Sequence, residues 1–304
     1  MFPFRCSARY PLPVTLSVVI ITYNEEANIG RALESVMPLV SGGKGEIIVV
    51  DSGSTDRTVE IAKSLGAKVY LEEWKGYGAQ KNSGIDKATG DWILSLDADE
   101  EADAELIGEL TGCYATGESI PKPESREWCL TREGASQASG SLDISKGRAV
   151  GFSIHRKNFF LGRWIEHGGF WPDPKLRLFH RGYGRVDERS VHETIQASGR
   201  VVGIERGALI HHSYPTLSDY IDHMNRYSSL GAEMAVANGP RSFSVIDILL
   251  RPVATFIYNY CFRLGFLDGR EGLLLHFYHA VYVSWKYAKA WELSRSKKTL
   301  RPPS

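Results

Sequence analysis

Features that mark several common classes of protein are scarce or missing in this sequence. The 304 residues include only four cysteines, which lie far apart and form no C-x-x-C pair. This spacing argues against a structural zinc site or a disulfide framework and fits a reducing compartment. Lysine plus arginine equals aspartate plus glutamate at 36 each, so no excess of positive charge indicates a nucleic acid as partner.

Long hydrophobic runs and two nucleotide-binding motifs are also absent. The apolar run at residues 16–21 is short and leads directly into polar residues, so we expect no signal peptide. The uncharged stretch at 272–285 has 14 residues, fewer than the roughly 20 that a membrane-spanning helix needs. No G-x-G-x-x-G follows the first predicted strand, and G-x-x-x-x-G-K-[ST] does not occur. A dinucleotide-binding fold and a P-loop NTPase are therefore not expected.

Between residues 16 and 100 the sequence contains a regular alternation of strand and helix patterns. Short apolar, β-branched runs predict buried strands, and apolar residues at helical spacing between them predict helices. The expected strands are 16–21, 46–50, 68–71 and 92–97, and the expected helices are 28–40, 57–65 and one that ends at residue 88. This order predicts an α/β fold with a mostly parallel sheet and helices on both faces.

The fourth of these strands ends in two carboxylates one residue apart, Asp97 and Asp99. In an extended chain the two side chains lie on the same side. Two like charges so close repel each other unless a cation or a hydrogen-bond network lies between them. Mg²⁺ or Mn²⁺ suits that position and leaves room for phosphate oxygens of a substrate. The alternative is a strand followed by an acidic helix start, with Asp99 as the N-cap.

Polar residues follow the other strands as well. Thr22, Tyr23 and Glu25 come after the first strand, and Asp51 ends the second. Ligands of such sheets bind outside the carboxyl ends of the strands, so we expect these side chains to gather with the two carboxylates around one ligand. Lys81, which comes after the third strand, is a cation placed to meet a diphosphate.

Four ordered motifs in this region resemble those of the inverting glycosyltransferases of family 2, which have the GT-A fold. They are VVIITYNE at 18–25, VVDSGSTD at 49–56, QKNSG at 80–84 and LDADE at 96–100. The resemblance implies a Rossmann-like GT-A domain that moves a hexose from a nucleotide-diphosphate sugar with inversion. It also implies a divalent metal, Mg²⁺ or Mn²⁺, as cofactor and UDP-glucose as the expected donor.

The resemblance implies a role for each residue at the nucleoside end of the donor. Thr22, Tyr23 and Glu25 would line the nucleoside pocket, and Asp51 would hydrogen-bond a uracil-type base.

At the other end of the donor, the same resemblance implies that Lys81 faces the diphosphate. Asp97 would lie near the ribose and the metal, and Asp99 would be the principal metal ligand. We expect Arg177, on a strand predicted at 175–179, to help Lys81 offset the diphosphate charge. The metal and these cations would stabilise charge that accumulates on the departing nucleoside diphosphate.

An inverting transferase needs one general base to deprotonate the acceptor hydroxyl as it attacks. The resemblance places that acid about ninety residues after the metal carboxylates, where Glu193 falls within VHE at 191–193. Many family members have an aspartate at this point, so the His-Glu pair marks a subgroup variant. Asp187 and Glu188 are rivals for this role, and a surface ion pair of Glu193 with an arginine is the structural alternative.

The resemblance extends over nearly the whole chain except residues 112–148. RWIEHGGFWPD at 163–173, RLF at 177–179, VHE at 191–193 and RP at 251–252 with GFLDG at 265–269 are similar to the subgroup that adds glucose to the lipopolysaccharide inner core of Gram-negative bacteria. This implies a glycan or glycolipid acceptor. The aromatic and basic stretch at 159–174 suits an acceptor pocket, and an ordinary packed loop is the alternative.

Three other functions fit parts of the sequence. The first is the same chemistry on a polyprenyl-phosphate acceptor. The second, of another class, is an inactive glycan-binding or scaffold protein. The third is a nucleotidyltransferase, since such enzymes also use paired carboxylates on similar sheets. The nucleoside pattern of Tyr23 and Asp51 favours sugar transfer over the third.

Two apolar, aromatic-rich segments at 243–264 and 272–293 are followed by a cluster of basic residues. Such segments are typical of amphipathic helices that lie in a membrane interface. We therefore expect a cytoplasmic protein that is peripheral on the inner face of the cytoplasmic membrane. The alternative is a helical pair packed on the sheet or on a second subunit.

These patterns together predict the organisation of the chain. We expect a lead-in at 1–14, the nucleotide-sugar-binding half of a GT-A domain at 15–111, a flexible excursion at 112–148, the acceptor and catalytic half at 149–214, and a helical region at 215–304 that associates with a membrane or packs on protein.

Overall fold

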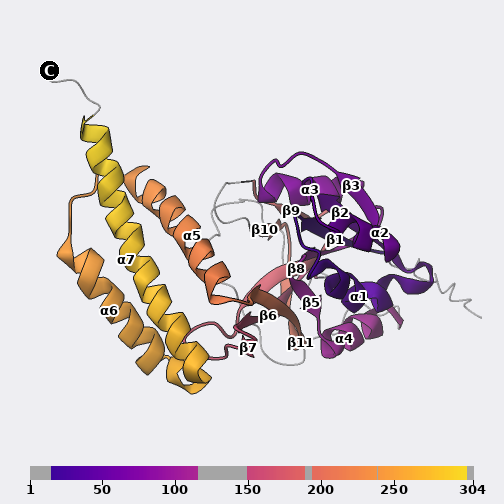
Figure 1. Cartoon of the computed structure of the whole chain (residues 1–304). Coiled ribbons are helices and arrows are strands. Elements are labelled where there is room, and N and C mark those ends of the chain that lie inside the picture. Colours follow the sequence, from indigo (N-terminus) through magenta and orange to yellow (C-terminus); the bar gives the residue numbers. More distant parts are fainter. Residues whose placement is uncertain (1–14, 116–148, 189–193, 238, 300–304) are drawn as a thin grey trace, which may run out of the picture. The chain divides into compact units, whose positions relative to one another are not determined.

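The computed structural model describes residues 15–115, 149–188, 194–237 and 239–299 (Figure 1). The chain divides into two compact units. The first comprises Met1–His155 and Pro174–Leu209, and the second comprises Arg156–Asp173 and Ile210–Ser304. The predicted lead-in and residues 116–148 of the predicted excursion lie outside the described residues. Residues 112–115 complete a helix, α4 (Ala104–Ala115).

The first unit begins with four parallel strands, as the sequence predicts. They are β1 (Leu16–Thr22), β2 (Gly45–Asp51), β3 (Lys68–Leu71) and β4 (Trp92–Asp97), in the spatial order β3-β2-β1-β4. The three connecting helices are α1 (Ile29–Val40), α2 (Thr58–Ser64) and α3 (Tyr77–Lys87). The predicted α/β architecture, consistent with a GT-A fold, is therefore confirmed.

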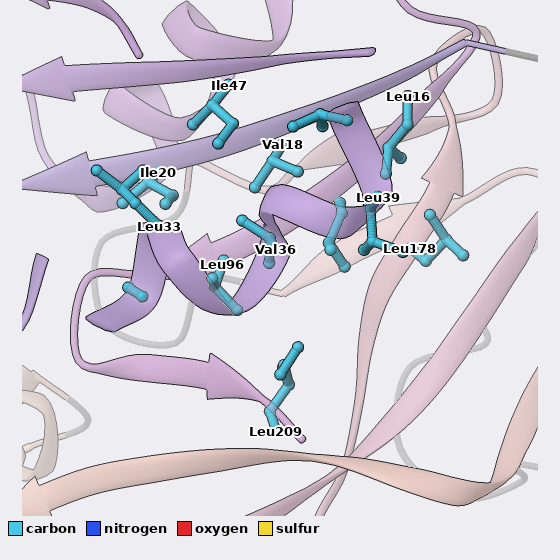
Figure 2. Close-up of a cluster of buried hydrophobic side chains, with 14 of the residues drawn as sticks. Leu16, Val18, Ile20, Leu33, Val36, Leu39, Ile47, Leu96, Leu178 and Leu209 are labelled. Carbon is cyan, nitrogen blue, oxygen red and sulfur yellow. The ribbon is translucent and has the colours of Figure 1, made fainter. Parts of the chain in front are cut away.

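Helices cover both faces of this parallel sheet, which is why its strands are almost continuously apolar. Alternate residues of β1 point to opposite faces. Val18 and Ile20 belong to a core cluster that includes Leu33 of α1 (Figure 2). Val19 belongs to a second cluster that includes Ile85 of α3. Residues of α2 and α4 join the first cluster, so α1, α2 and α4 cover one face and α3 covers the other.

Beyond β4 the sheet becomes antiparallel. The strand order continues from β4 through β8 (Pro174–His180), β6 (Gly151–Phe160) and β11 (Val201–Tyr214) to β5 (Glu100–Ala102), and β7 (Arg163–Trp164) pairs with β6. Strand β8 is antiparallel to both β4 and β6. It corresponds to the predicted strand at 175–179 and brings Arg177 beside the end of β4. A separate pair is formed by β9 (Gly184–Val186) and β10 (Ile195–Ala197).

The second unit is mainly helical. Its helices are α5 (Leu217–Ala237), a helical segment of π and α turns over residues 246–262 that includes α6 (Arg251–Phe256), a short turn at Gly265–Asp268, and α7 (Gly269–Thr299). Helices α5 and α7 share two small cores, one with Tyr220 and Leu275 and one with Ala232 and Ala290. In the described ranges no helix combines the length and the apolarity required to span a membrane.

The start of α5 has a capping box formed by Thr216 and Asp219. The Asp219 backbone N–H donates to Thr216 Oγ1 over 3.2 Å, and the Thr216 backbone N–H donates to the Asp219 carboxylate over 3.2 Å. These two bonds satisfy amide groups that would otherwise have no partner in the first turn.

Candidate functional site

The carboxyl ends of β1, β2 and β4 bring the predicted polar residues to one edge of the sheet. Thr22 is opposite Asp51 in the register of β1 and β2. Ile21, its chain neighbour, is opposite Asp97 in the register of β1 and β4. Three side chains that are far apart in sequence therefore lie at adjacent strand ends, where ligands of parallel sheets bind.

Asp51 is fully buried, and its own loop holds it in one orientation. Its carboxylate accepts hydrogen bonds from the Gly53 backbone N–H over 2.9 Å, from the Ser54 backbone N–H over 2.8 Å, and from the Ser54 hydroxyl. Ser54 Oγ in turn accepts a bond from the Asn24 backbone N–H over 2.8 Å. The loops that follow β1 and β2 are thus tied together around a fixed carboxylate.

Thr22 and Tyr23 differ in their exposure. The Thr22 hydroxyl is buried and has no hydrogen-bond partner among the described residues. A buried polar group without a partner costs free energy unless a ligand or water satisfies it. Tyr23 is 56% exposed, so its ring is accessible for stacking against a planar ligand group.

Glu25 lies in the acidic part of this edge. Burial raises the pKa of the Glu25 carboxyl, and the charges of Asp99 and Asp56 raise it further against the opposing effect of a hydrogen bond from Asn28. That bond joins Asn28 Nδ2 to Glu25 Oε2 over 2.7 Å. Asp99 is therefore close enough to disfavour the charged form of Glu25.

Asp97 lies between two buried cations. Lys81 Nζ is 2.9 Å from Asp97 Oδ1, and Arg177 Nη2 is 2.6 Å from Asp97 Oδ2. Arg177 Nη2 is also 2.5 Å from Oε1 of Glu100, whose side chain is fully buried. The two cations and two carboxylates sum to zero charge, which is how buried ionic groups are accommodated.

The pKa values in this cluster follow from these pairs. Burial by itself would raise the pKa of Asp97, but the charges of Arg177 and then Lys81 outweigh it and hold this pKa well below its usual range. Burial would likewise lower the pKa of Arg177, whereas Asp97 and Glu100 raise it. The structure thus brings Lys81, Asp97 and Arg177 together, and both cations contact Asp97.

The turn after β4 carries Asp99, two residues from Asp97. Asp99 is not the N-cap of the helix that follows. That helix, α4, begins at Ala104, and Asp103 Oδ1 accepts the backbone N–H of Leu106 over 2.9 Å. The simple structural explanation for Asp99 therefore does not hold.

The two carboxylates can be compared with what a divalent cation requires. Among the residues that the structure describes, no group of three or more His, Cys, Asp and Glu side chains could hold a metal ion. Mg²⁺ is usually bound by one or two carboxylates together with phosphates of the substrate and waters. A site with only two carboxylates would therefore bind such an ion jointly with a nucleotide diphosphate.

The predicted base, Glu193, lies outside the described residues, and so does His192. The structure does describe Asp187 and Glu188, the two other candidates for the general base. Glu188 Oε1 accepts a hydrogen bond from Asn82 Nδ2 over 2.9 Å, and Asp187 Oδ2 accepts one from Gln196 Nε2 over 3.2 Å.

Asn82 and Glu100 are two residues to which the sequence assigned no role. Asn82 donates to the carbonyl of Val186 over 2.9 Å and accepts from its N–H over 3.1 Å, so α3 holds the chain that leads toward Glu193. Glu100 balances Arg177. Both lie within motifs that the sequence singled out, QKNSG and LDADE, but the identity of their partners depends on long-range contacts.

Comparison with known proteins identifies the family to which the chain is similar. The family model for glycosyl transferase family 2 matches residues 17–171. The chain is 28% identical over 286 residues to the lipopolysaccharide core biosynthesis glycosyltransferase LpsC of Rhizobium meliloti (strain 1021), covering 90% of this chain and 93% of that protein. It is 28% identical over 288 residues to an uncharacterized glycosyltransferase of Rickettsia typhi (strain ATCC VR-144 / Wilmington), covering 92% of this chain and 87% of that protein.

Among solved structures, one similar chain is glucosyl-3-phosphoglycerate synthase from Mycobacterium tuberculosis in complex with Mn²⁺, UDP-glucose and phosphoglyceric acid. It is 34% identical, the match covers 35% of this chain and 41% of that chain, and the TM-score is 0.30. The match to the family model covers half of the sequence and all four motifs between residues 18 and 100, and the chain therefore belongs to glycosyl transferase family 2.

Proposed function

We propose that this glycosyltransferase moves glucose from UDP-glucose to a glycan acceptor of the lipopolysaccharide-core type, with inversion and in one displacement. The observation that carries the proposal is the gathering of Asp51, Lys81 and Asp97 at one edge of the sheet. The similarity to LpsC along nearly the whole chain supports the acceptor class.

The nucleoside would bind over the ends of β1 and β2. Asp51 is fixed by the N–H groups of its own loop, so its carboxylate is already in place to accept a hydrogen bond from the base. The buried hydroxyl of Thr22 would gain a partner, and the exposed ring of Tyr23 would cover the nucleoside. Glu25 would close the pocket from the α1 side.

The diphosphate would bind over the end of β4. Lys81 and Arg177 lie there, each paired with Asp97, and Asp97 with Asp99 would hold the divalent cation, Mg²⁺ or Mn²⁺. When bound, the cation supplies Lewis-acid stabilisation of charge on the leaving diphosphate. Lys81 and Arg177 would add to this stabilisation, because fixed charges aimed at a developing anion need no reorganisation during the reaction.

Glu193 would act as the general base that accepts the proton of the attacking hydroxyl. Replacing a general base typically costs a factor of about 10²–10⁴ in rate. We expect Glu193→Gln to reduce turnover by such a factor and to leave the affinity for UDP-glucose unchanged. Glu188→Gln is the matched control, because it makes the same substitution at a described rival.

A single assay series tests the donor and acceptor assignments. Purified protein is incubated with labelled UDP-glucose, Mn²⁺ and a deacylated core oligosaccharide, with a lipid extract as the second acceptor. We expect transfer to the oligosaccharide and loss of transfer in Asp99→Ala or with a chelator. Product that partitions only into the organic phase would contradict the acceptor assignment. Unchanged turnover of Asp99→Ala would show that Asp99 does not hold the metal.

We also propose that the second unit places the enzyme on the cytoplasmic face of the membrane. Over residues 246–257, the large apolar residues Ile246, Leu249, Leu250, Val253 and Ile257 recur at helical spacing, and each is at least 43% exposed. In a globular protein such a stripe faces the core. The adjoining residues Phe262, Phe266 and Leu267 are 75%, 47% and 50% exposed, which extends the apolar surface.

The occupant that suits this surface is an anionic lipid bilayer. An exposed apolar patch of this kind marks an interaction site, and the basic residues Arg251, Arg263 and Arg270 belong to the same stretch of chain. Apolar insertion combined with attraction to anionic head groups is how interfacial helices bind. The predicted alternative, packing on a second subunit, is a possible outcome of the test.

Sedimentation with phosphatidylglycerol-containing vesicles tests this location. We expect the wild-type chain to bind vesicles and the double variant Leu249→Asp with Phe262→Asp to lose binding. Leu71→Asp is the control, because Leu71 is 65% exposed but belongs to the first unit. If the wild-type chain stays in the supernatant and light scattering shows a dimer, the partner of this surface is a second copy of the chain and not the membrane.

A further inference from the structure

The second unit contains a cavity that the donor site does not use. Its volume is about 250 Å³, and it is lined by residues of β6, β11, α7 and the segment at 165–173. Phe170, Tyr214 and Leu275 form apolar parts of its wall. The polar parts are Arg156, Asn158, Asp173, His211 and Ser213. All of these residues belong to the second unit.

The polar side chains of the wall form one hydrogen-bonded chain. Arg156 binds the Asp173 carboxylate with two nitrogens, Nε at 3.0 Å and Nη2 at 2.9 Å. Asn158 Nδ2 donates to the same carboxylate over 3.2 Å. Asn158 Oδ1 lies 2.8 Å from His211 Nδ1, which is 2.7 Å from Ser213 Oγ.

This chain fixes the orientation of the His211 ring. Because the amide NH₂ of Asn158 faces Asp173, its carbonyl oxygen faces the imidazole and accepts a hydrogen bond from Nδ1–H. The wall therefore places a guanidinium at one end and an imidazole at the other.

This combination is suited to a sugar ring. A sugar presents several hydroxyls that both donate and accept, and it presents C–H faces that pack on aromatic rings such as Phe170 and Tyr214. Pockets for drug-sized ligands usually start at about 300 Å³. A cavity of about 250 Å³ therefore suits one monosaccharide unit.

We infer that this cavity binds one sugar unit of the glycan acceptor, an inference that rests on the proposed function for the identity of the glycan. The polar chain recognises the hydroxyls, and the aromatic wall packs on the ring. The cavity thus contributes to acceptor selection, whereas the edge of the parallel sheet selects the donor.

Direct binding tests this inference without depending on turnover. Deacylated core oligosaccharide is titrated into the full-length protein by calorimetry, in the absence of donor. The test variant is His211→Gln, and His212→Gln is the matched control, because His212 is the next residue of β11 and does not line the cavity. A second test variant, Ser213→Leu, fills the cavity and keeps the Arg156–Asp173 pair.

We expect both test variants to weaken oligosaccharide binding at least tenfold and His212→Gln to bind as the wild type does. Thermal melting confirms that each variant is folded, and UDP-glucose titration confirms that its donor site is intact. Equal affinity in all four proteins, or no binding to the wild type, overturns the inference. Failure of the proposed function looks different, because the wild-type protein would then bind the oligosaccharide without transferring glucose to it.

Discussion

Replacing Arg177 with methionine tests the charge balance at the end of β4. Arg177 is buried, and its Nη2 lies 2.6 Å from Asp97 and 2.5 Å from Glu100. Methionine fills a similar volume but removes the charge, so Asp97 keeps its contact with Lys81 and Glu100 loses its contact with Arg177. Breaking a buried ion pair by removing one partner typically costs about 3–5 kcal/mol, because the remaining charge is poorly solvated.

The expected change can be measured as a shift in the melting temperature of the first unit. For a unit of its size, 1 kcal/mol corresponds to a shift of roughly 2–4 °C, so Arg177→Met should lower the melting temperature by about 6–20 °C. The double variant Arg177→Met with Glu100→Gln restores neutrality, and we expect it to recover most of the loss. Differential scanning calorimetry at pH 7 measures both shifts.

A surface ion pair provides the control for this experiment. Arg185 makes a bidentate contact with Asp86 at 2.6 and 3.0 Å, but the two side chains are 53% and 61% exposed. Exposed pairs contribute only about 0–1 kcal/mol, so Arg185→Met should shift the melting temperature by a few degrees at most. Equal shifts for the two arginine variants, or a double variant no more stable than Arg177→Met alone, would refute the charge-balance argument.

Three further predictions concern packing and pH. Burial lowers the pKa of His276 to about 4 from 6.5, so the unfolded chain binds more protons than the folded one between these pH values. Stability should fall as the pH drops from 6.5 to 4, by up to roughly 3 kcal/mol more than in His276→Gln; parallel denaturation curves for the two proteins would disprove this. A Cβ at Gly84 would lie 2.4 Å from Val19 Cγ1, so Gly84→Ala should lower the free energy of unfolding by about 1–3 kcal/mol. A Cβ at Gly108 would have no atom within 4 Å, so Gly108→Ala should raise the free energy of unfolding by up to about 1 kcal/mol. Denaturant unfolding that ranks the two variants the other way would contradict the packing argument. The Asp268 carboxylate accepts a hydrogen bond from the His167 backbone N–H over 2.8 Å, so Asp268→Ala should destabilise the second unit by about 1–3 kcal/mol. An unchanged melting temperature would show that this hydrogen bond does not contribute to stability.

Much of the first unit is predictable from local sequence patterns. The β1 run LSVVIIT is apolar on both faces, so it predicts a strand covered by helices on both sides, and the structure confirms this. The edge at which Asp51 and Asp97 meet follows from the same alternation, because all parallel strands end at one edge. The capping box at Thr216 is likewise a local signal.

The partners within the site depend on the tertiary structure. Arg177 reaches Asp97 only because β8 pairs antiparallel with β4, and sequence periodicity gives no information about which strand will be the neighbour. Asn82 of α3 and Val186 of β9 likewise meet across a separation of 104 residues.

The sequence by itself determined the strand and helix periods, the polar strand ends and the motifs of the family, since each of these depends on residues close together in the chain. Only the tertiary structure decided that Lys81 and Arg177 share Asp97, and that Ile246, Leu249 and Val253 remain exposed. An amphipathic period shows that a helix has an apolar face, but whether that face is covered depends on every other element that could pack against it.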